Sequence, residues 1–429
     1  MPFLPMLFTV GKIYRGWWVL VACSVIGAYG GGVYFYGFTM FFNPLKDELG
    51  ITSAQTSIVF SLTRLEGAFE GAIVGFLIDR YGSRKIMAIG IPVAGIGFII
   101  WAIFVNNYTS FLLVYVGIIA MGINGGFFHP AMAVANNWFV KKRSTAMATI
   151  SVSVGIGGSI IVPALAFIID GWGWREAALV AGIGMLFVIW PLTLFIRHKP
   201  EDLGLLPDGD SISSMSDQTD SDSLGTSSVY VEEHNFTVTE AFRTQSMWLL
   251  ISAITLRFTS HTAVMVHLAP ILQDRGMSTV AAGGAVGLLV FVSIPGRMAV
   301  GWLGDKYAKR KVIAILLILQ LLSLIILAEA TTLWHLYAFI GLWAFSYGAG
   351  ILNWAIVGDY FGRERFATLR GLMGLIYSAG AVVGPIYAGW VFDEKQSYTE
   401  AIWVFAVITA LAILLYWIAA PPKQNQTES

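Results

Sequence analysis

Two arginines, Arg257 and Arg297, lie in stretches of the sequence that are otherwise apolar. An ionisable residue in a membrane-spanning segment is costly and is expected to serve a function. A guanidinium pairs with a carboxylate through two parallel hydrogen bonds, and between apolar walls this attraction exceeds its value in water. The residues therefore predict an organic-anion site at Arg297. The alternative is a structural arginine that ties down helix ends or pairs with an acid. Arg257 is a second anion contact or neutralises an acid.

A third charged group consists of Arg64, Glu66 and Glu70. The two glutamates are four residues apart, so they share one face of a helix, where like charges repel. A proton held on one carboxylate, or an arginine from another helix, would relieve this repulsion. Glu70, with Glu66 and Arg64 beside it, is thus a candidate for proton coupling. The alternative, which we favour, is an ion pair between helices that stabilises one conformation.

Aromatic, amide and imidazole side chains in apolar stretches are further candidates for substrate contact. Tyrosine hydroxyls and asparagine amides can bind a second carboxylate oxygen or a hydroxyl, although most aromatic residues of a membrane protein only pack. These candidates are Tyr34, Tyr36, Asn124, Phe128, His261, Asn353, Trp354 and Tyr377. No metal pattern surrounds the histidines, so neither a metal nor another cofactor is expected.

The elements that must position these residues are membrane-spanning helices. Of the 429 residues, 56% are hydrophobic and 12% are charged, about half the charged fraction of a soluble protein. Zero net charge argues against nucleic-acid binding, and the single cysteine, Cys23, excludes a disulfide framework. A span needs about 20 mostly apolar residues. Twelve stretches qualify: 17–42, 51–78, 86–105, 110–138, 144–169, 177–196, 246–272, 278–304, 312–330, 333–361, 371–392 and 400–420.

A polar segment separates the first six predicted spans from the last six. From Glu201 to Glu240 the chain has ten Asp or Glu, eight Ser and no Lys or Arg, a composition that cannot bury a core. We therefore expect an N-terminal bundle at 1–196, an acidic linker at 197–245 and a C-terminal bundle at 246–429. Lys and Arg are biased towards one side of this topology: of 26, 19 fall on the side of the N-terminus, four on the opposite side and three within spans. The bias predicts cytoplasmic termini and a cytoplasmic linker in a multi-pass protein of the plasma membrane.

An internal repeat supports the division into halves. Residues 75–85 read GFLIDRYGSRK and residues 301–311 read GWLGDKYAKRK. Both copies follow the second span of a half. Duplicated bundles are a common architecture of secondary transporters.

The repeated pattern Gly-x-x-x-Asp-(Arg/Lys)-x-(Gly/Ala)-x-Arg-Lys resembles the signature loop of the major facilitator superfamily. Narrower features at 60–67, 200–209, 267–270 and 295–297 resemble the branch of the monocarboxylate porters and oxalate:formate antiporters. The resemblance implies an all-α membrane protein of twelve transmembrane helices in two pseudo-symmetric six-helix bundles, functioning as a monomer. It also implies that the arginine at the position of Arg297 binds a substrate carboxylate.

The resemblance further implies a secondary active transporter of a small organic anion, working by rocker-switch alternating access in the bilayer. Coupling would be proton symport or exchange for another anion. This sequence departs from the pattern of the branch at two places. Animal-type porters carry an aspartate at the position of Ser293. The antiporters carry a lysine in the eleventh span, whereas residues 371–389 here contain no Lys or Arg. The second difference favours a monocarboxylate unless Arg257 substitutes for the lysine.

The two signature loops are expected to form a cytoplasmic gate that pairs when the transporter faces outward. Its predicted members are Asp79, Arg80, Arg84, Asp305, Lys306 and Arg310. An exporter of hydrophobic compounds and a non-transporting sensor remain alternatives with the same fold. An enzyme is not expected, because the spans hold no nucleophile–base pair, no metal set and no phosphate loop.

Overall fold

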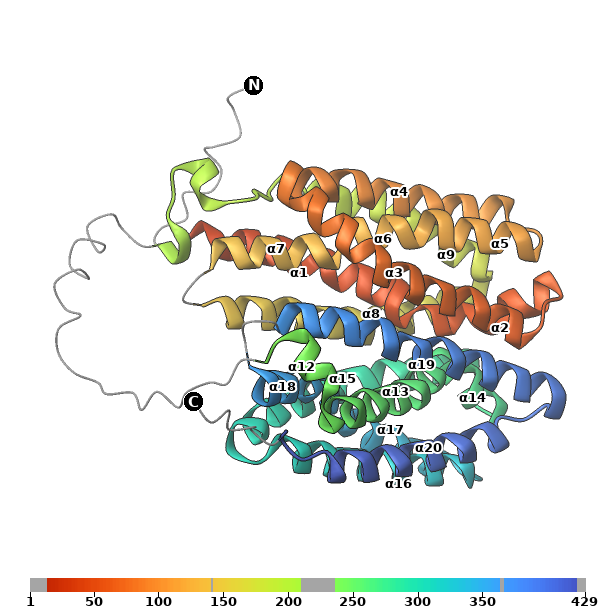
Figure 1. Cartoon of the computed structure of the whole chain (residues 1–429). Helices are drawn as coiled ribbons and strands as arrows, with labels where there is room; N and C mark the ends of the chain where they lie inside the picture. Colours follow the sequence, from red (N-terminus) through yellow and green to blue (C-terminus); the bar gives the residue numbers. More distant parts are fainter. Residues whose placement is uncertain (1–13, 140–141, 210–235, 363–365, 423–429) are drawn as a thin grey trace, which may run out of the picture.

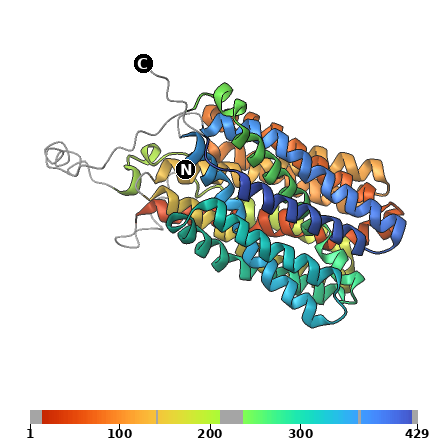
Figure 2. The same cartoon turned by 60° about the horizontal axis from the view of Figure 1, so that its bottom comes forward.

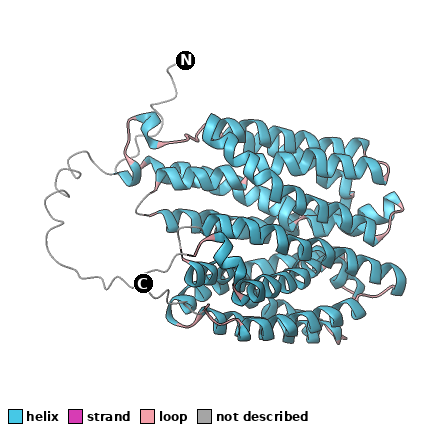
Figure 3. Ribbon diagram, in the orientation of Figure 1, coloured by secondary structure: helices cyan, strands magenta, loops and turns pink. Residues whose placement is uncertain are grey.

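The computed structural model describes residues 14–139, 142–209, 236–362 and 366–422. All regular secondary structure in these ranges is helical (Figures 1 and 3). This confirms the prediction of an all-α membrane protein.

The first half contains six helical segments, each of which we call a pass. Three of these passes consist of several shorter helices in succession. The first pass is α1 (Arg15–Gly30), the π-helical η1 (Gly31–Tyr36) and α2 (Phe38–Leu49). The second and third are α3 (Ser53–Tyr81) and α4 (Ser83–Phe104). The fourth is α5 (Tyr108–Val114), η2 (Tyr115–Ala120), α6 (Met121–Gly126) and α7 (Phe128–Trp138). The fifth is α8 (Arg143–Trp172), and the sixth is α9 (Trp174–Gly184), η3 (Met185–Ile189) and α10 (Trp190–Leu192).

The second half repeats this plan. Its passes are α13 (Gln245–Val266) with α14 (Leu268–Asp274), then α15 (Thr279–Lys306), α16 (Lys309–Ala328), α17 (Leu333–Ser346) with α18 (Ala349–Phe361), α19 (Phe366–Lys395) and α20 (Thr399–Ile418). The predicted linker range also holds short helices: η4 (Pro200–Leu203), η5 (Pro207–Gly209) and α12 (Val238–Arg243).

Within the described ranges, ten helices are long and apolar enough to cross a membrane. The two other predicted spans correspond to α3 and to α17 with α18. Helix α3 is long enough, but Arg64, Glu66 and Glu70 lower its mean hydropathy. The tenth pass is divided at Tyr347 and Gly348, so that neither piece has the length of a full span.

The helix ends follow from local sequence. Helix α3 begins with a capping box, in which Thr52 accepts from the backbone N–H of Gln55 and the Gln55 side chain accepts from that of Thr52. It ends at Gly82, whose φ of 85° is accessible to glycine and strained for other residues. Gly82 thus makes the sharp turn of the first signature loop, between α3 and α4.

The two halves pack along two long helix pairs, α8 with α15 and α3 with α19. In Figure 1 the helices of the first half lie above those of the second, and Figure 2 shows the same bundle turned. The α8–α15 contact is close: a Cβ on Gly287 would lie 2.9 Å from the carbonyl oxygen of Ser159. Small residues therefore let the two halves approach at the backbone.

Candidate functional site

Arg297 lies on α15 at the boundary between the halves. Its Nη2 donates a hydrogen bond of 3.0 Å to the hydroxyl of Tyr36, from η1 of the first half. Its guanidinium also lies 4.4 Å from the ring centroid of Tyr347, and the Tyr347 hydroxyl donates to that of Tyr36 at 3.5 Å. Within the described residues no acid pairs with Arg297, and its buried Nε has no hydrogen-bond partner. Arg297 is therefore a cation at the boundary between the halves that has no acidic partner among the described residues.

Tyr347 is a central residue that the sequence analysis missed. It follows the last residue of α17, at the break in the tenth pass. The ring of His261 meets the Tyr347 ring edge to face at 4.8 Å and stacks on Trp343 at 5.5 Å. The sequence Tyr347–Gly348 within an apolar stretch was a signal that could have identified it. A helix that is interrupted at membrane depth must border protein or a cavity.

Arg64 lies between two aromatic rings and not against the glutamates of its own helix. Its guanidinium is 4.3 Å from the centroid of Phe35 and 4.7 Å from that of Phe60, close enough for cation–π attraction. Tyr34, which stacks on Tyr115 at 5.7 Å, is within electrostatic range of the same arginine. In the described residues Arg64 forms no ion pair, so it adds positive charge to the region around Arg297.

Arg257 is the most enclosed of the three arginines, with 2% of its surface exposed. Its Nε has no hydrogen-bond partner among the described residues, and Phe258 lies 5.8 Å away. Arg64, Arg257 and Arg297 all lie within electrostatic range of His261. Three arginines, on α3, α13 and α15, thus act electrostatically on one histidine, and none of them has a described acidic partner.

The two glutamates form a separate polar group. Glu70 Oε2 accepts a hydrogen bond of 2.7 Å from Asn124 Nδ2, on α6. Glu66 Oε2 is buried and has no partner in the described residues, and neither carboxylate pairs with an arginine there. This places Asn124 with the proton-coupling candidates.

The other predicted contacts are dispersed. Asn353 Oδ1 is buried and accepts from the Tyr416 hydroxyl at 2.8 Å, Tyr377 packs on Phe258 at 4.8 Å, and Phe128 is exposed beside His129. The side chain of Trp354 lies outside the described part of the structure, as do those of Asp79 and Asp305.

The basic gate residues occupy equivalent places in the two halves. Arg80 and Lys306 lie near the ends of α3 and α15 against Tyr81 and Tyr307, while Arg84 and Arg310 lie in the first turns of α4 and α16.

The end of the bundle opposite η4 and α12 is held closed by hydrogen bonds between the halves. The Asp393 carboxylate of α19 accepts from the backbone N–H groups of Ser53 (2.8 Å) and Ala54 (2.9 Å), at the start of α3. Asn43 donates to Gln273 at 2.6 Å. Ser57 contacts His267 at 2.9 Å. We call these four hydrogen bonds the outer latch, where outer means the end of the bundle opposite η4 and α12.

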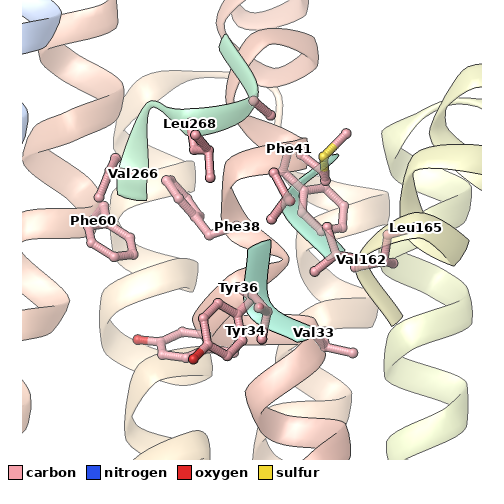
Figure 4. Close-up of a cluster of buried hydrophobic side chains, with 14 of the residues drawn as sticks. Val33, Tyr34, Tyr36, Phe38, Phe41, Phe60, Val162, Leu165, Val266 and Leu268 are labelled. Carbon is pink, nitrogen blue, oxygen red and sulfur yellow. The ribbon is translucent and has the colours of Figure 1, made fainter. Parts of the chain in front are cut away.

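An apolar seal lies between the outer latch and Arg297. Figure 4 shows Phe38 and Phe60 of the first half clustered with Val266 and Leu268 of the second, with Tyr34 and Tyr36 below them. Both halves supply this cluster, so apolar side chains pack across their boundary between Tyr36 and the outer latch. Among the described residues, the hydrogen bonds between the halves lie at Arg297 or on its outer side.

Comparison with known proteins agrees with this architecture. The family model described as Major Facilitator Superfamily matches residues 22–354 and 296–429. Monocarboxylate transporter 2 of Rattus norvegicus is 23% identical over 410 residues, covering 94% of this chain and 82% of the relative. A probable galactarate/D-glucarate transporter of Bacillus subtilis is 24% identical, covering 88% and 85%.

A solved structure shares the fold. A bacterial homolog of the human lysosomal transporter Spinster, in an inward-facing and occupied conformation, matches with a TM-score of 0.73 at 17% identity, covering 95% of this chain and 97% of that one. With a family model that spans most of the chain and a membrane-embedded all-helical bundle, the chain belongs to the major facilitator superfamily and is a transporter, not an enzyme.

Proposed function

We propose that this chain is a secondary active transporter of a small organic anion. A substrate carboxylate would bind Arg297 between the halves, where the fork of the guanidinium fixes its orientation. The observation that carries the proposal is the position of Arg297: it bridges Tyr36 and Tyr347, from opposite halves, and has no described acidic partner.

The relatives support an anionic substrate. Their names specify monocarboxylate and galactarate or glucarate, which share ionised carboxylate groups. A buried, unpaired guanidinium suits a carboxylate substrate better than a hydrophobic one, because an apolar compound would leave the positive charge uncompensated.

The proposed mechanism is rocker-switch alternating access. The outer latch and the apolar seal would close the outer end while substrate exchanges with the cytoplasm. A substrate shifts the balance between inward and outward states only by its different affinity for the two. Arg297 bonds Tyr36 across the boundary, so rocking of the halves would change its contacts, which supports a difference in affinity.

Uptake by the purified chain in proteoliposomes tests the function. We expect accumulation of at least one radiolabelled carboxylate from a panel of mono- and dicarboxylates, and no accumulation of uncharged analogues. Running the panel with a pH gradient, and again with unlabelled anion inside, separates proton symport from exchange. Transport of hydrophobic cations with no response to any carboxylate would contradict the proposal.

We propose Glu70 as the proton carrier if coupling is to protons. Glu70→Gln should abolish accumulation driven by a pH gradient yet retain anion exchange at equal pH. The glutamine keeps an acceptor for Asn124 but has no carboxylate to take up a proton. Glu400→Gln, an exposed glutamate on α20, is the control and should behave as wild type. An unchanged response of the Glu70 variant to the gradient would assign Glu70 a structural role.

A further inference from the structure

We propose that the central site selects an anion with two separated carboxylates, the second of which binds Arg257. This rests on the proposed function and specifies its substrate class. The juxtaposition behind it is geometric. The Arg297 guanidinium lies 4.4 Å from the centroid of the Tyr347 ring, and the His261 ring meets the same tyrosine at 4.8 Å. Arg257 lies one helical turn from His261 on α13, and no acid is paired to either arginine in the described residues.

Charge compensation favours a dianion. Removing a charged side chain from water costs several kcal/mol unless a partner of opposite charge compensates it. A monocarboxylate on Arg297 would leave Arg257 buried and uncompensated, whereas a dicarboxylate would neutralise both. Aromatic rings partly stabilise Arg64 and Arg297, but Phe258, 5.8 Å from Arg257, is at the limit of useful cation–π distance. Of the three arginines, Arg257 would therefore be stabilised most by a bound anion.

Gly350 of α18 leaves Arg257 approachable. Among the described residues, a Cβ built on Gly350 would meet two atoms within 4 Å, Nη1 and Nη2 of Arg257, each at 3.6 Å. Gly350 is itself partly exposed, so the position of its missing side chain lies between the surface of α18 and the terminal nitrogens of Arg257, and we take this position as the approach to them. The two arginines lie on different helices, α13 and α15, and each has an unpartnered Nε. Two separate guanidinium groups suit a ligand with two separated carboxylates better than a ligand with a single doubly charged group.

Matched pairs of ligands test this inference on the full-length purified chain. Succinate and glutarate are compared with their monoamides, succinamate and glutaramate, which have nearly the same shape and one charge fewer. At neutral pH we expect at least one dicarboxylate to bind tenfold or more tightly than its monoamide, measured by titration of the ligand-induced rise in Tm. Equal affinity, or tighter binding of the monoamide, would overturn the inference but leave the anion proposal standing. No response to any carboxylate would instead count against the anion proposal itself. Tighter binding of inorganic phosphate would overturn the requirement for two separated groups.

The variant Arg257→Gln separates a binding role from a structural one. If Arg257 binds substrate, the variant without ligand should have an unchanged or higher Tm, because an uncompensated buried charge has been removed. Its preference for the dicarboxylate should fall to about one. A lower Tm together with a retained preference would assign Arg257 to structure and overturn the inference.

Gly350→Ala provides an independent variant that keeps the charge. Its methyl group would lie in ordinary contact with the Arg257 nitrogens, so the helix should fold while the approach to them is blocked. We expect loss of the dicarboxylate preference. The control is Gly341→Ala on α17, where a Cβ would meet nothing within 4 Å and the preference should persist. A full preference in the Gly350 variant would contradict the assigned approach.

Discussion

Arg297→Ala should abolish carboxylate uptake while the protein remains folded. Truncating one partner of a desolvated charge pair costs about 3 kcal/mol, which corresponds to roughly a hundredfold loss of affinity. Tyr36 and Tyr347 would remain, but their hydroxyls supply no positive charge. Initial rates of uptake in proteoliposomes, normalised to correctly folded protein by size-exclusion chromatography, measure the effect. Arg297→Lys should give an intermediate rate, because it keeps the charge and loses the planar fork.

A structural arginine supplies the matched control. Arg175 bonds the Glu48 carboxylate at 2.7 Å and the carbonyl oxygens of Ala102 and Val105 at 2.6 and 2.9 Å. Arg175→Ala should therefore lower Tm and leave the rate per folded molecule nearly unchanged. The Arg297 variant should show the opposite pattern. Near-normal uptake by Arg297→Ala would remove its role in substrate binding.

Asp393→Ala should shift the conformational equilibrium towards an open outer end. The carboxylate accepts two backbone hydrogen bonds at the N-terminus of α3, across the boundary between the halves. A capping interaction contributes about 1–2 kcal/mol, and the negative charge is also favourable at a helix N-terminus. Because the contact needs a closed outer end, its loss should raise the open population by about five- to thirtyfold.

A thiol placed beneath the outer latch measures this shift. Met40 on α2 is 1% exposed, and the native Cys23 is fully buried, so Met40→Cys gives a site-specific reporter for an impermeant maleimide added outside. We expect faster labelling when Asp393→Ala is present. Glu400→Ala, which removes an exposed carboxylate not bonded to the other half, should leave the rate unchanged. Equal labelling in both variants would mean that Asp393 does not control the closed state.

The fold was predictable because its signals are repeated and local. Apolar stretches of span length, the two signature loops and the polar break indicated a two-part helical membrane protein before any contact was known. The separation of Arg64 from Glu66 was also available from the sequence: residues two apart on a helix do not face each other. We grouped them by proximity in the chain, whereas Arg64 lies between Phe35 and Phe60.

The site itself depends on contacts between distant segments. Tyr36 and Tyr347 are 311 residues apart and meet at Arg297, a relationship that no periodicity within one helix encodes. The interruptions at η1 and between α17 and α18 also change which faces of these passes point inward, because a π-helical turn displaces the register of the α-helix that follows. Tyr347 was missed because its partners, Tyr36 and Arg297, come from other passes, although the break at Tyr347 and Gly348 was a signal within its own pass.

These interruptions have a consequence for how the carrier's speed relates to its affinity. The weakened turns of the first and tenth passes are the same places that supply Tyr36 and Tyr347. If a pass bends where its backbone hydrogen bonding is irregular, the point of bending coincides with residues that contact the proposed substrate arginine, Arg297. A substitution that raises substrate affinity there would also make the bending point more rigid. Among variants of these two tyrosines, a higher affinity should therefore accompany a lower transport rate.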